Sequence, residues 1–285
     1  MTEFEFDFLR TYLKGRSGLA LTPEKRYLVE SRLNPLCRRF ELDTLSELIA
    51  GLRGGRDSDL ETAVVEAMTT NETFFFRDKV PFDLFAQVLL PRFLKGRAAT
   101  RRLRIWCAAA STGQEPYSLA MLLSEAGPRL AGWQVEILAT DISSEVLDRA
   151  RAGLYSQFEV QRGLPIGLLL KYFTQVGDQW QIAPQIRQMV SFRQLNLVKE
   201  FGALGSFDIV YCRNVLIYFD GPTKTEVLKR LAGALATDGA LLLGAAETVL
   251  GLTGALSSHP DHRGLYVKAA PGIALPETQR MVATR

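Results

Sequence analysis

Short apolar segments that alternate with helical segments constrain the fold of this chain most strongly. From about residue 80 onward, runs such as RIWCAAA and FDIVYC contain few polar residues, and each is followed by a segment with helical periodicity. Strands this short and apolar are typical of a parallel sheet covered by helices on both faces. The sequence therefore predicts an α/β fold with a doubly wound, mainly parallel sheet. Strands are expected at 103–108, 133–139, 207–212, 239–247 and 263–269.

Two regions depart from this alternation. Residues 1 to about 70 have apolar residues at helical spacing, and Thr22 followed by Pro23 is typical of a helix start. We expect a small all-α domain there, since 285 residues exceed the usual ~100–150 of one domain. Residues 153–192 contain a short helix and then FTQVGDQWQIA, which predicts a hairpin turning at Gly177 and Asp178. We expect this region to be a small insertion at the sheet edge, and the tail after Ala270 to be disordered.

The composition excludes several classes of protein. The net charge is only +3, which argues against general nucleic-acid binding. The N-terminus is acidic and no apolar run approaches 18 residues, so we expect no signal peptide, no membrane span and a cytoplasmic location. Cysteines 37, 107 and 212 are far apart, which predicts neither a disulfide framework nor a structural zinc site. The two histidines, 259 and 262, leave most of the chain without a histidine base.

Three clusters of polar or small residues follow predicted strands, where open α/β sheets bind their ligands. The loop AAASTGQE after the first strand lets a ligand approach the backbone, although a tight turn without a ligand is the alternative. Asp141 ends the second strand, where a carboxylate can accept hydrogen bonds from ribose hydroxyls or cap the next helix, as Ser143 also could. Cys212 ends the 207–212 strand and Arg213 follows it, with Tyr218 in the loop beyond; the alternative is core packing of Val215, Ile217 and Phe219 with Arg213 exposed.

The segment EKRYLVESRLNPLCRRF is rich in basic residues. Lys25 and Arg32 are seven apart and share a helix face, and Arg39 would join them if the helix continued. Pro35 argues against that continuation, because proline lacks a backbone donor and clashes one turn back. The segment is either a solvated helix face or a docking surface for an acidic partner.

Four motifs occur in order along the chain: NETFFFR, WCAAASTGQEPYS, ATDIS and CRNVLIYF. Together they closely resemble the CheR-type chemoreceptor glutamate methyltransferases over residues 10 to 270. The resemblance implies a Rossmann-like class I methyltransferase sheet, mostly parallel and of seven strands. It also implies an N-terminal all-α domain at 1–75, a catalytic domain at 76–285 that binds S-adenosylmethionine, and an inserted antiparallel β-subdomain at about 153–192.

The resemblance also implies roles for particular residues. The cofactor, released as S-adenosylhomocysteine, would contact Asn71, Thr73, Arg77, Glu115, Asp141 at the ribose, Asn196, Leu197, Cys212 and Arg213. Tyr218 would lie near the sulfonium and the incoming carboxylate, with Arg77 or Arg213 steering that carboxylate. A basic helix with Lys25, Arg26, Arg32, Arg38 and Arg39 would dock on the cytoplasmic helical bundle of chemoreceptors. No metal is expected, and we expect a monomer.

The sequence departs from the family pattern at two places. Gln114 replaces the first acid of a common G-E-E-P-Y-S motif, but Glu115 retains the second. In some relatives the β-subdomain grips a pentapeptide at the receptor C-terminus. The hairpin here is short, so we expect an enzyme that does not depend on such a tether.

The reaction suits a chain without a histidine base. A glutamate side chain, with a pKa of ~4.3, is ionised at neutral pH and can attack a sulfonium methyl directly. A nicotinamide-dependent oxidoreductase is the rival enzyme class, but the single Gly113 is unlike a phosphate-binding glycine loop. A non-catalytic module on the same fold is the third alternative. For TTNETFFFRD we expect the phenylalanines to wedge the joint between the two domains, while Asn71, Thr73 and Arg77 face the cofactor.

Overall fold

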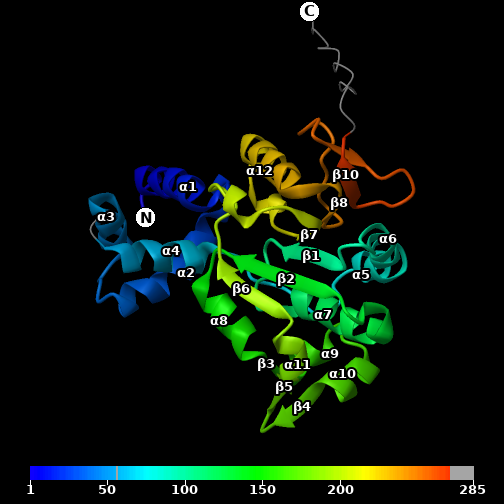
Figure 1. Ribbon diagram of the computed structural model, residues 1–285. Helices are drawn as coiled ribbons and strands as arrows, with labels where there is room; N and C mark the ends of the chain where they lie inside the picture. The colour runs from blue at the N-terminus through cyan, green and yellow to red at the C-terminus, as the bar shows by residue number, and fades with distance from the viewer. Residues whose placement is uncertain (56, 270–285) are drawn as a thin grey trace, which may run out of the picture.

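The computed structural model describes residues 1–55 and 57–269, so the tail expected to be disordered lies outside the described residues. Four helices form the N-terminal domain, drawn in blue in Figure 1. They are α1 (Glu3–Ser17), α2 (Arg26–Arg39), α3 (Leu45–Gly54) and α4 (Ser58–Met68). Their buried faces form a separate hydrophobic cluster that includes Leu9, Leu33, Leu48 and Val64. Thr2, Thr44 and Asp57 cap α1, α3 and α4 through their side chains.

Helix α2 corrects one expectation. Pro35 lies inside α2, which continues to Arg39, whereas the sequence predicted an interruption. Leu33 and Leu36, on either side of the proline, are both buried in the domain core. The carbonyl of Ser31, left without its helical donor, belongs to an exposed residue and can bind water. Packing on the buried face therefore outweighs the lost hydrogen bond.

The second domain contains a seven-stranded sheet in the order β6-β2-β1-β7-β8-β10-β9. The first five strands pair in parallel, and β10 runs antiparallel to β8 and β9. The expected seven-stranded, mostly parallel sheet is therefore confirmed. The strands are β1 (Arg102–Cys107), β2 (Gln134–Asp141), β6 (Val190–Gln194), β7 (Phe207–Cys212), β8 (Leu235–Leu243), β9 (Leu256–Ser258) and β10 (Leu265–Lys268).

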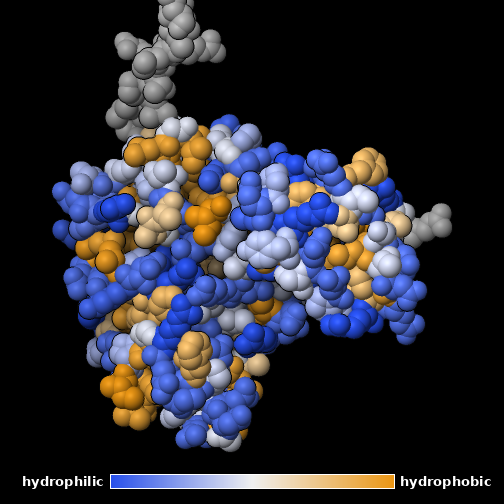
Figure 2. Space-filling model, turned by 180° about the vertical axis from the view of Figure 1, so that it is seen from behind, coloured by the Kyte–Doolittle hydropathy of each residue, from blue (hydrophilic) through white to orange (hydrophobic). Residues whose placement is uncertain are grey.

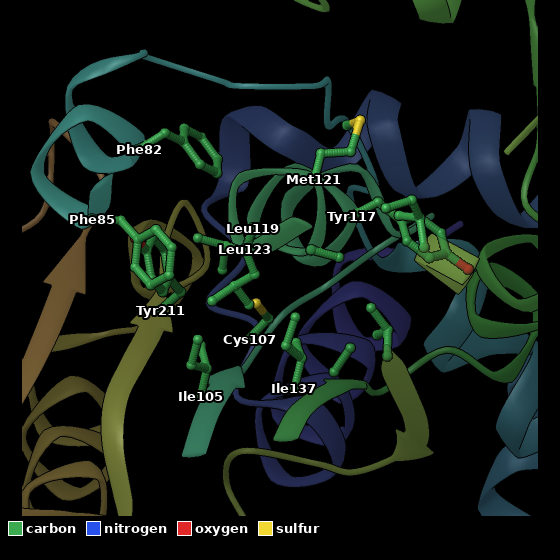
Figure 3. Close-up of a cluster of buried hydrophobic side chains, with 14 of the residues drawn as sticks. Phe82, Phe85, Ile105, Cys107, Tyr117, Leu119, Met121, Leu123, Ile137 and Tyr211 are labelled. Carbon is green, nitrogen blue, oxygen red and sulfur yellow. The ribbon is translucent and has the colours of Figure 1, made fainter. Parts of the chain in front are cut away.

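Alternate side chains of the strands enter two different hydrophobic clusters. Ile105 and Cys107 of β1 pack with α5 (Val80–Leu84), α6 (Leu90–Gly96) and α7 (Gln114–Ala126). Trp106, between them, packs on the other face with α12 (Gly221–Ala234). Figure 3 shows the first cluster, in which side chains of the strands and helices point toward one another. A π-helical turn, Phe85–Leu89, joins α5 to α6, and α8 (Ser144–Ala152) follows β2.

A small β-subdomain interrupts the second domain between α8 and β6 and forms the lower lobe in Figure 1. Its sheet has the order β3-β5-β4 and is antiparallel, and Gly177 turns the hairpin at φ +63°. The predicted hairpin is therefore confirmed. Residues 190–192, assigned to the insertion, instead begin β6 and pair with β2. The elements are β3 (Leu154–Ser156), α9 (Gln157–Gln161), α10 (Ile166–Tyr172), β4 (Phe173–Val176), β5 (Gln179–Ile182) and α11 (Pro184–Arg187).

The phenylalanines of TTNETFFFRD do not wedge the joint to the helical domain. Phe75 is fully buried in the sheet-domain cluster, where its ring meets those of Tyr155 and Phe173 edge to face at 5.0 and 5.6 Å between centroids. Both partners belong to the β-subdomain. The helical-domain cluster contains none of the three phenylalanines among its described members. Phe75 therefore fastens this stretch to the sheet domain and its insertion. Across 1–55 and 57–269, no helix combines the length and apolarity needed to cross a membrane.

Candidate functional site

A cavity lies between the end of the helical domain and the carboxyl ends of β1, β2 and β7. It encloses about 990 Å³ of space, open solvent at its mouth included. Figure 2 shows the surface of the molecule from behind Figure 1, with the helical domain as a separate lobe on the right. The cavity wall includes nine of the predicted site residues: Asn71, Thr73, Arg77, Glu115, Asp141, Asn196, Leu197, Arg213 and Tyr218.

The loop after β1 forms one wall of the cavity. Ala108, Ala109 and Ser111 line it, and Ser111 has a left-handed backbone with φ +48°. Gly113, at φ +94°, precedes α7; a Cβ there would lie 3.0 Å from the Cβ of Ala150 in α8. Glycine is therefore required both by the backbone angle and by the close approach of α8.

Asp141 connects two loops at the cavity wall. Its Oδ2 accepts a hydrogen bond from the backbone of Ser111 at 2.8 Å, and its Oδ1 accepts one from Ser143 at 3.1 Å. Ser143, not Asp141, is the N-cap of α8, so the capping alternative for Asp141 is wrong. Burial raises the pKa of the Asp141 carboxyl above its ordinary value, although the backbone donors oppose the shift.

Arg213 is paired on both sides and deeply buried, with its side chain only 2% exposed. Its Nη1 donates to Glu115 at 2.8 Å, and its Nη2 donates to Asp78 at 2.7 Å and to the carbonyl of Arg77 at 2.9 Å. Burial raises the pKa of Glu115, while the Arg213 charge lowers it. The alternative of an exposed Arg213 is therefore wrong. Two carboxylates balance this guanidinium, so it is not a free anion-binding group.

Arg77 differs from Arg213 in its partners. Its Nη1 donates to the backbone carbonyl of Glu72 at 2.9 Å, and its guanidinium lies over the ring of Phe74 at 5.6 Å. No carboxylate pairs with Arg77 in the part of the chain that the structure describes. The turn around Arg77 is strained, since Phe76, Asp78 and Lys79 all have positive φ, at 52°, 67° and 48°. Arg77 is thus the guanidinium of the cavity wall that pairs with no described carboxylate.

Asn196 and Tyr218 join the two domains at the cavity. The Asn196 amide donates to the carbonyl of Arg16 in α1 at 2.6 Å. The carbonyl of Tyr218 accepts from the backbone of Ala20 at 2.8 Å, and the adjoining Phe219 forms a β-bridge with Leu19. The Tyr218 side chain is half-buried and lines the cavity.

Cys212 is the cofactor-site candidate that does not reach the cavity wall. It is the last residue of β7, and its side chain is fully buried in the cluster beneath α12. Strand alternation directs Cys212 to that face. The thiol pKa is raised well above its ordinary value by burial.

The basic residues of α2 have different surroundings. Arg32 donates to the carbonyls of Met68 at 2.9 Å and Thr69 at 2.6 Å, so its guanidinium satisfies carbonyls at the C-terminal end of α4. Arg26 pairs with Glu30 at 3.4 Å. Lys25 is half-buried in the 3-10 turn before α2, while Arg38 and Arg39 are exposed.

Sequence reasoning missed two carboxylates near the cavity, Asp78 and Glu247. Asp78 lies in the strained turn and pairs with Arg213. Glu247 accepts hydrogen bonds from the loop after β7. The sequence feature that could have identified Glu247 is an acidic residue at the end of an apolar run, as for Asp141. The sequence placed Glu247 inside the strand, whereas β8 ends at Leu243.

Both domains of the chain are similar to known protein families. The family description "CheR methyltransferase, SAM binding domain" matches residues 71–264. A second, "CheR methyltransferase, all-alpha domain", matches residues 5–69. The chain belongs to the CheR methyltransferase family.

Two relatives agree with this CheR assignment over most of their length. Chemotaxis protein methyltransferase 1 of Vibrio cholerae is 44% identical over 250 residues, covering 87% of this chain and 90% of that protein. Chemotaxis protein methyltransferase 1 of Pseudomonas aeruginosa is 43% identical over 275 residues, covering 94% and 96%. Among solved structures, the DhpI–SAH complex aligns with a TM-score of 0.31 and 18% identity, over 68% of this chain and 72% of that chain. A TM-score this low carries no information about the family assignment.

The CheR match confirms the expected family, enzyme class and fold. It assigns an S-adenosylmethionine-binding domain to the part of the chain that contains β1, β2 and β7. The oxidoreductase alternative is therefore wrong.

Proposed function

We propose that this chain transfers a methyl group from S-adenosylmethionine to glutamate side chains in the cytoplasmic helical bundle of chemoreceptors. The products are glutamate methyl esters and S-adenosylhomocysteine. The observation that carries the proposal is the convergence on one cavity of residues from four separate motifs, among them Arg77, Glu115, Asp141 and Tyr218. The CheR family assignment supports the same reaction. We also propose that the reaction takes place in the cytoplasm and that the enzyme is a monomer.

The residues present fit S-adenosylmethionine. Each oxygen of Asp141 accepts one backbone hydrogen bond, which leaves lone pairs for ribose hydroxyls. The Nε of Arg213 is buried without a hydrogen-bond partner among the described residues, which points to a ligand or water at this place. The charged residues on the cavity wall are three carboxylates and two guanidinium groups: Glu72, Glu115, Asp141, Arg77 and Arg213. Glu72 pairs with Arg162 at 2.6 Å and Glu115 with Arg213 at 2.8 Å, so among the described residues Asp141 is the wall carboxylate without an ion pair, and its charge favours a cationic sulfonium.

The protein residues act by binding and orientation. When bound, S-adenosylmethionine supplies a methyl group on a positively charged sulfur. A substrate glutamate is already ionised at neutral pH and needs no base. Arg77 attracts its carboxylate, and the Tyr218 hydroxyl donates a neutral hydrogen bond that leaves the oxygen nucleophilic. Holding the reacting atoms in line lowers the barrier by several kcal/mol, up to roughly 7–11 in the best intramolecular cases.

Docking on the receptor is proposed for the exposed part of the basic helix. Arg38 and Arg39 are exposed at the end of α2, whereas Arg32 is occupied by backbone carbonyls. The β-subdomain has a short hairpin, and we propose that activity does not require a peptide tether there. Removing the C-terminal residues of the receptor should then leave the methylation rate unchanged.

The decisive experiment measures transfer of a labelled methyl group to a receptor cytoplasmic fragment, with base-labile esters as the readout. Tyr218→Phe should lower kcat about tenfold or more without changing the affinity for S-adenosylhomocysteine, since the lost hydrogen bond acts at the substrate. Reversing Arg38 and Arg39 to Glu should raise the KM for receptor only. No labelled ester from the unmodified enzyme would mean that the fold binds the cofactor without acting on receptors.

A further inference from the structure

One buried carboxylate holds the loop that carries Tyr218. Glu247, which is 8% exposed, accepts four backbone hydrogen bonds. Its Oε1 accepts from Val215 at 3.0 Å and from Leu216 at 2.7 Å. Its Oε2 accepts from Asn214 at 2.8 Å and from Gly244 at 2.7 Å. Hydrogen bonds to a charged acceptor are among the strongest in proteins, so these four bonds fix the loop after β7 to the loop after β8.

The loop needs such a partner because it leaves the sheet abruptly. Asn214 has a left-handed backbone with φ +58°, so its amide and the next two cannot continue the ladder of β7. Asn214, Val215 and Tyr218 all line the cavity. The backbone of Tyr218 donates to the carbonyl of Val215 at 3.1 Å, which ties the position of Tyr218 to the amides that Glu247 holds. The far end of the loop is held by Ala20, which donates to the Tyr218 carbonyl.

Gly244 leaves room for this carboxylate. A Cβ at Gly244 would lie 2.7 Å from the Oε2 of Glu247 and 2.8 Å from the Nδ2 of Asn214, closer than such atoms approach. Its backbone is not in the left-handed region, so alanine fits the chain itself but displaces the carboxylate. Gly244→Ala therefore perturbs the same contacts from the opposite side and keeps the glutamate.

We propose that Glu247 is a positioning residue for methyl transfer: it sets the place of Tyr218 through the backbone of residues 214–216. Glu247 itself does not line the cavity, so it acts through the loop. The inference rests on the proposed role of Tyr218 at the transferring methyl group. Small displacements matter here, because in-line transfer tolerates little misplacement of the reacting groups.

Three variants test the inference. Glu247→Gln replaces one oxygen with an amide nitrogen, which faces two backbone donors and can accept from neither. Glu247→Asp keeps the charge but is one methylene shorter, so it cannot reach all four amides. Gly244→Ala is the third variant. Glu226→Gln is the matched control, because Glu226 is exposed on α12 and, among residues 1–55 and 57–269, pairs only with Lys229 at 2.9 Å.

Hydrogen exchange and kinetics are measured on each protein, with binding of S-adenosylhomocysteine giving the number of folded sites. We expect all three variants, but not the control, to lose amide protection in residues 213–219 while β7 keeps its protection. Per folded site, kcat should fall about tenfold or more, with a smaller change in the KM for S-adenosylmethionine.

Specific results would overturn the inference. Unchanged exchange in the loop of Glu247→Gln, or unchanged kcat per folded site, would show that Glu247 contributes to stability alone. Full activity in Glu247→Asp with an unprotected loop would show that only its charge matters. An unmodified enzyme that shows the protected loop but no methyl transfer would instead contradict the proposed function.

Discussion

Arg32 lies outside the cavity but holds one of its walls. Its guanidinium donates to the carbonyls of Met68 and Thr69 at 2.9 and 2.6 Å and to the Oγ1 of Thr70 at 3.1 Å. Those three residues line the cavity, just before the NETFFFR motif. If Arg32 only docked the receptor, replacing it would change receptor methylation and leave cofactor binding unchanged. Arg32 should instead act on the cofactor, because it orders the chain where α4 ends.

The size of the effect follows from these contacts. Without Arg32, the end of α4 loses bonds from a charged donor that contribute roughly 1.5–3 kcal/mol each when well formed, and the lower end applies to this half-exposed group. If one residue of the wall becomes mobile, fixing it again on binding costs about 1–2 kcal/mol. Arg32→Leu should therefore raise the Kd for S-adenosylhomocysteine about fivefold to thirtyfold.

Calorimetry on Arg32→Leu, with urea unfolding alongside, tests this reasoning. Arg38→Leu is the control, since Arg38 is an exposed neighbour on the same helix. The control should leave the cofactor Kd unchanged. If Arg32→Leu binds the cofactor as tightly as the unmodified enzyme and raises only the KM for receptor, Arg32 docks the substrate and the structural role is wrong.

Three further predictions concern separate parts of the molecule. Phe75→Ala should lower the free energy of unfolding by about 3–5 kcal/mol in urea titrations, with a smaller effect on cofactor affinity, because Phe75 is fully buried away from the cavity. Asp141→Ala should weaken cofactor binding by roughly tenfold or more in calorimetry; unchanged affinity would remove Asp141 from the site. The pKa of Asp238 is lowered from 3.8, first by its hydrogen bond with Arg97. Stability from this pair is therefore fully present above pH 3.8 and is lost as the pH falls through the lowered pKa, so the Tm difference between the unmodified enzyme and Asp238→Asn should shrink as pH falls from about 6 to 3.

The central strands could be predicted from the sequence because they are buried on both faces and therefore uniformly apolar. Strand β7, for example, is buried at every position. The two sheet edges could not be predicted. Strand β6 reads VSFRQ, in which polar residues interrupt the apolar ones, and β9 has three residues. Short edge strands carry little apolar surface, so their sequences resemble loops.

The residues of the site could be predicted from the sequence, but their hydrogen-bond and ion-pair partners could not. Asp141 and Arg213 were found because the carboxyl ends of parallel strands meet at one edge. The partner of each side chain depends on contacts between distant segments, such as Arg213 with Asp78 across 135 residues. For the same reason the sequence did not show that Arg32 bonds to the end of α4 or that Cys212 lies beneath α12. Helical periodicity indicates which residues share a helix face, but not which segment of the chain packs against that face.

The charges in the cavity give one further consequence for the cofactor. Burial raises the pKa of both Glu115 and Asp141 above their ordinary values of 4.5 and 3.8. A bound sulfonium favours their ionised forms and so lowers both pKa values, and binding then releases protons. S-adenosylhomocysteine lacks that charge and should release fewer.

Calorimetry near pH 5, in buffers that differ in ionisation enthalpy, measures this difference directly. We expect more protons released per bound S-adenosylmethionine than per bound S-adenosylhomocysteine. Because proton release opposes binding in acid, the affinity for S-adenosylmethionine should also fall more steeply as the pH drops from 7 to 5. Equal proton release for the two ligands would mean that the buried carboxylates do not sense the sulfonium. The positive charge would then have to be balanced elsewhere in the cavity.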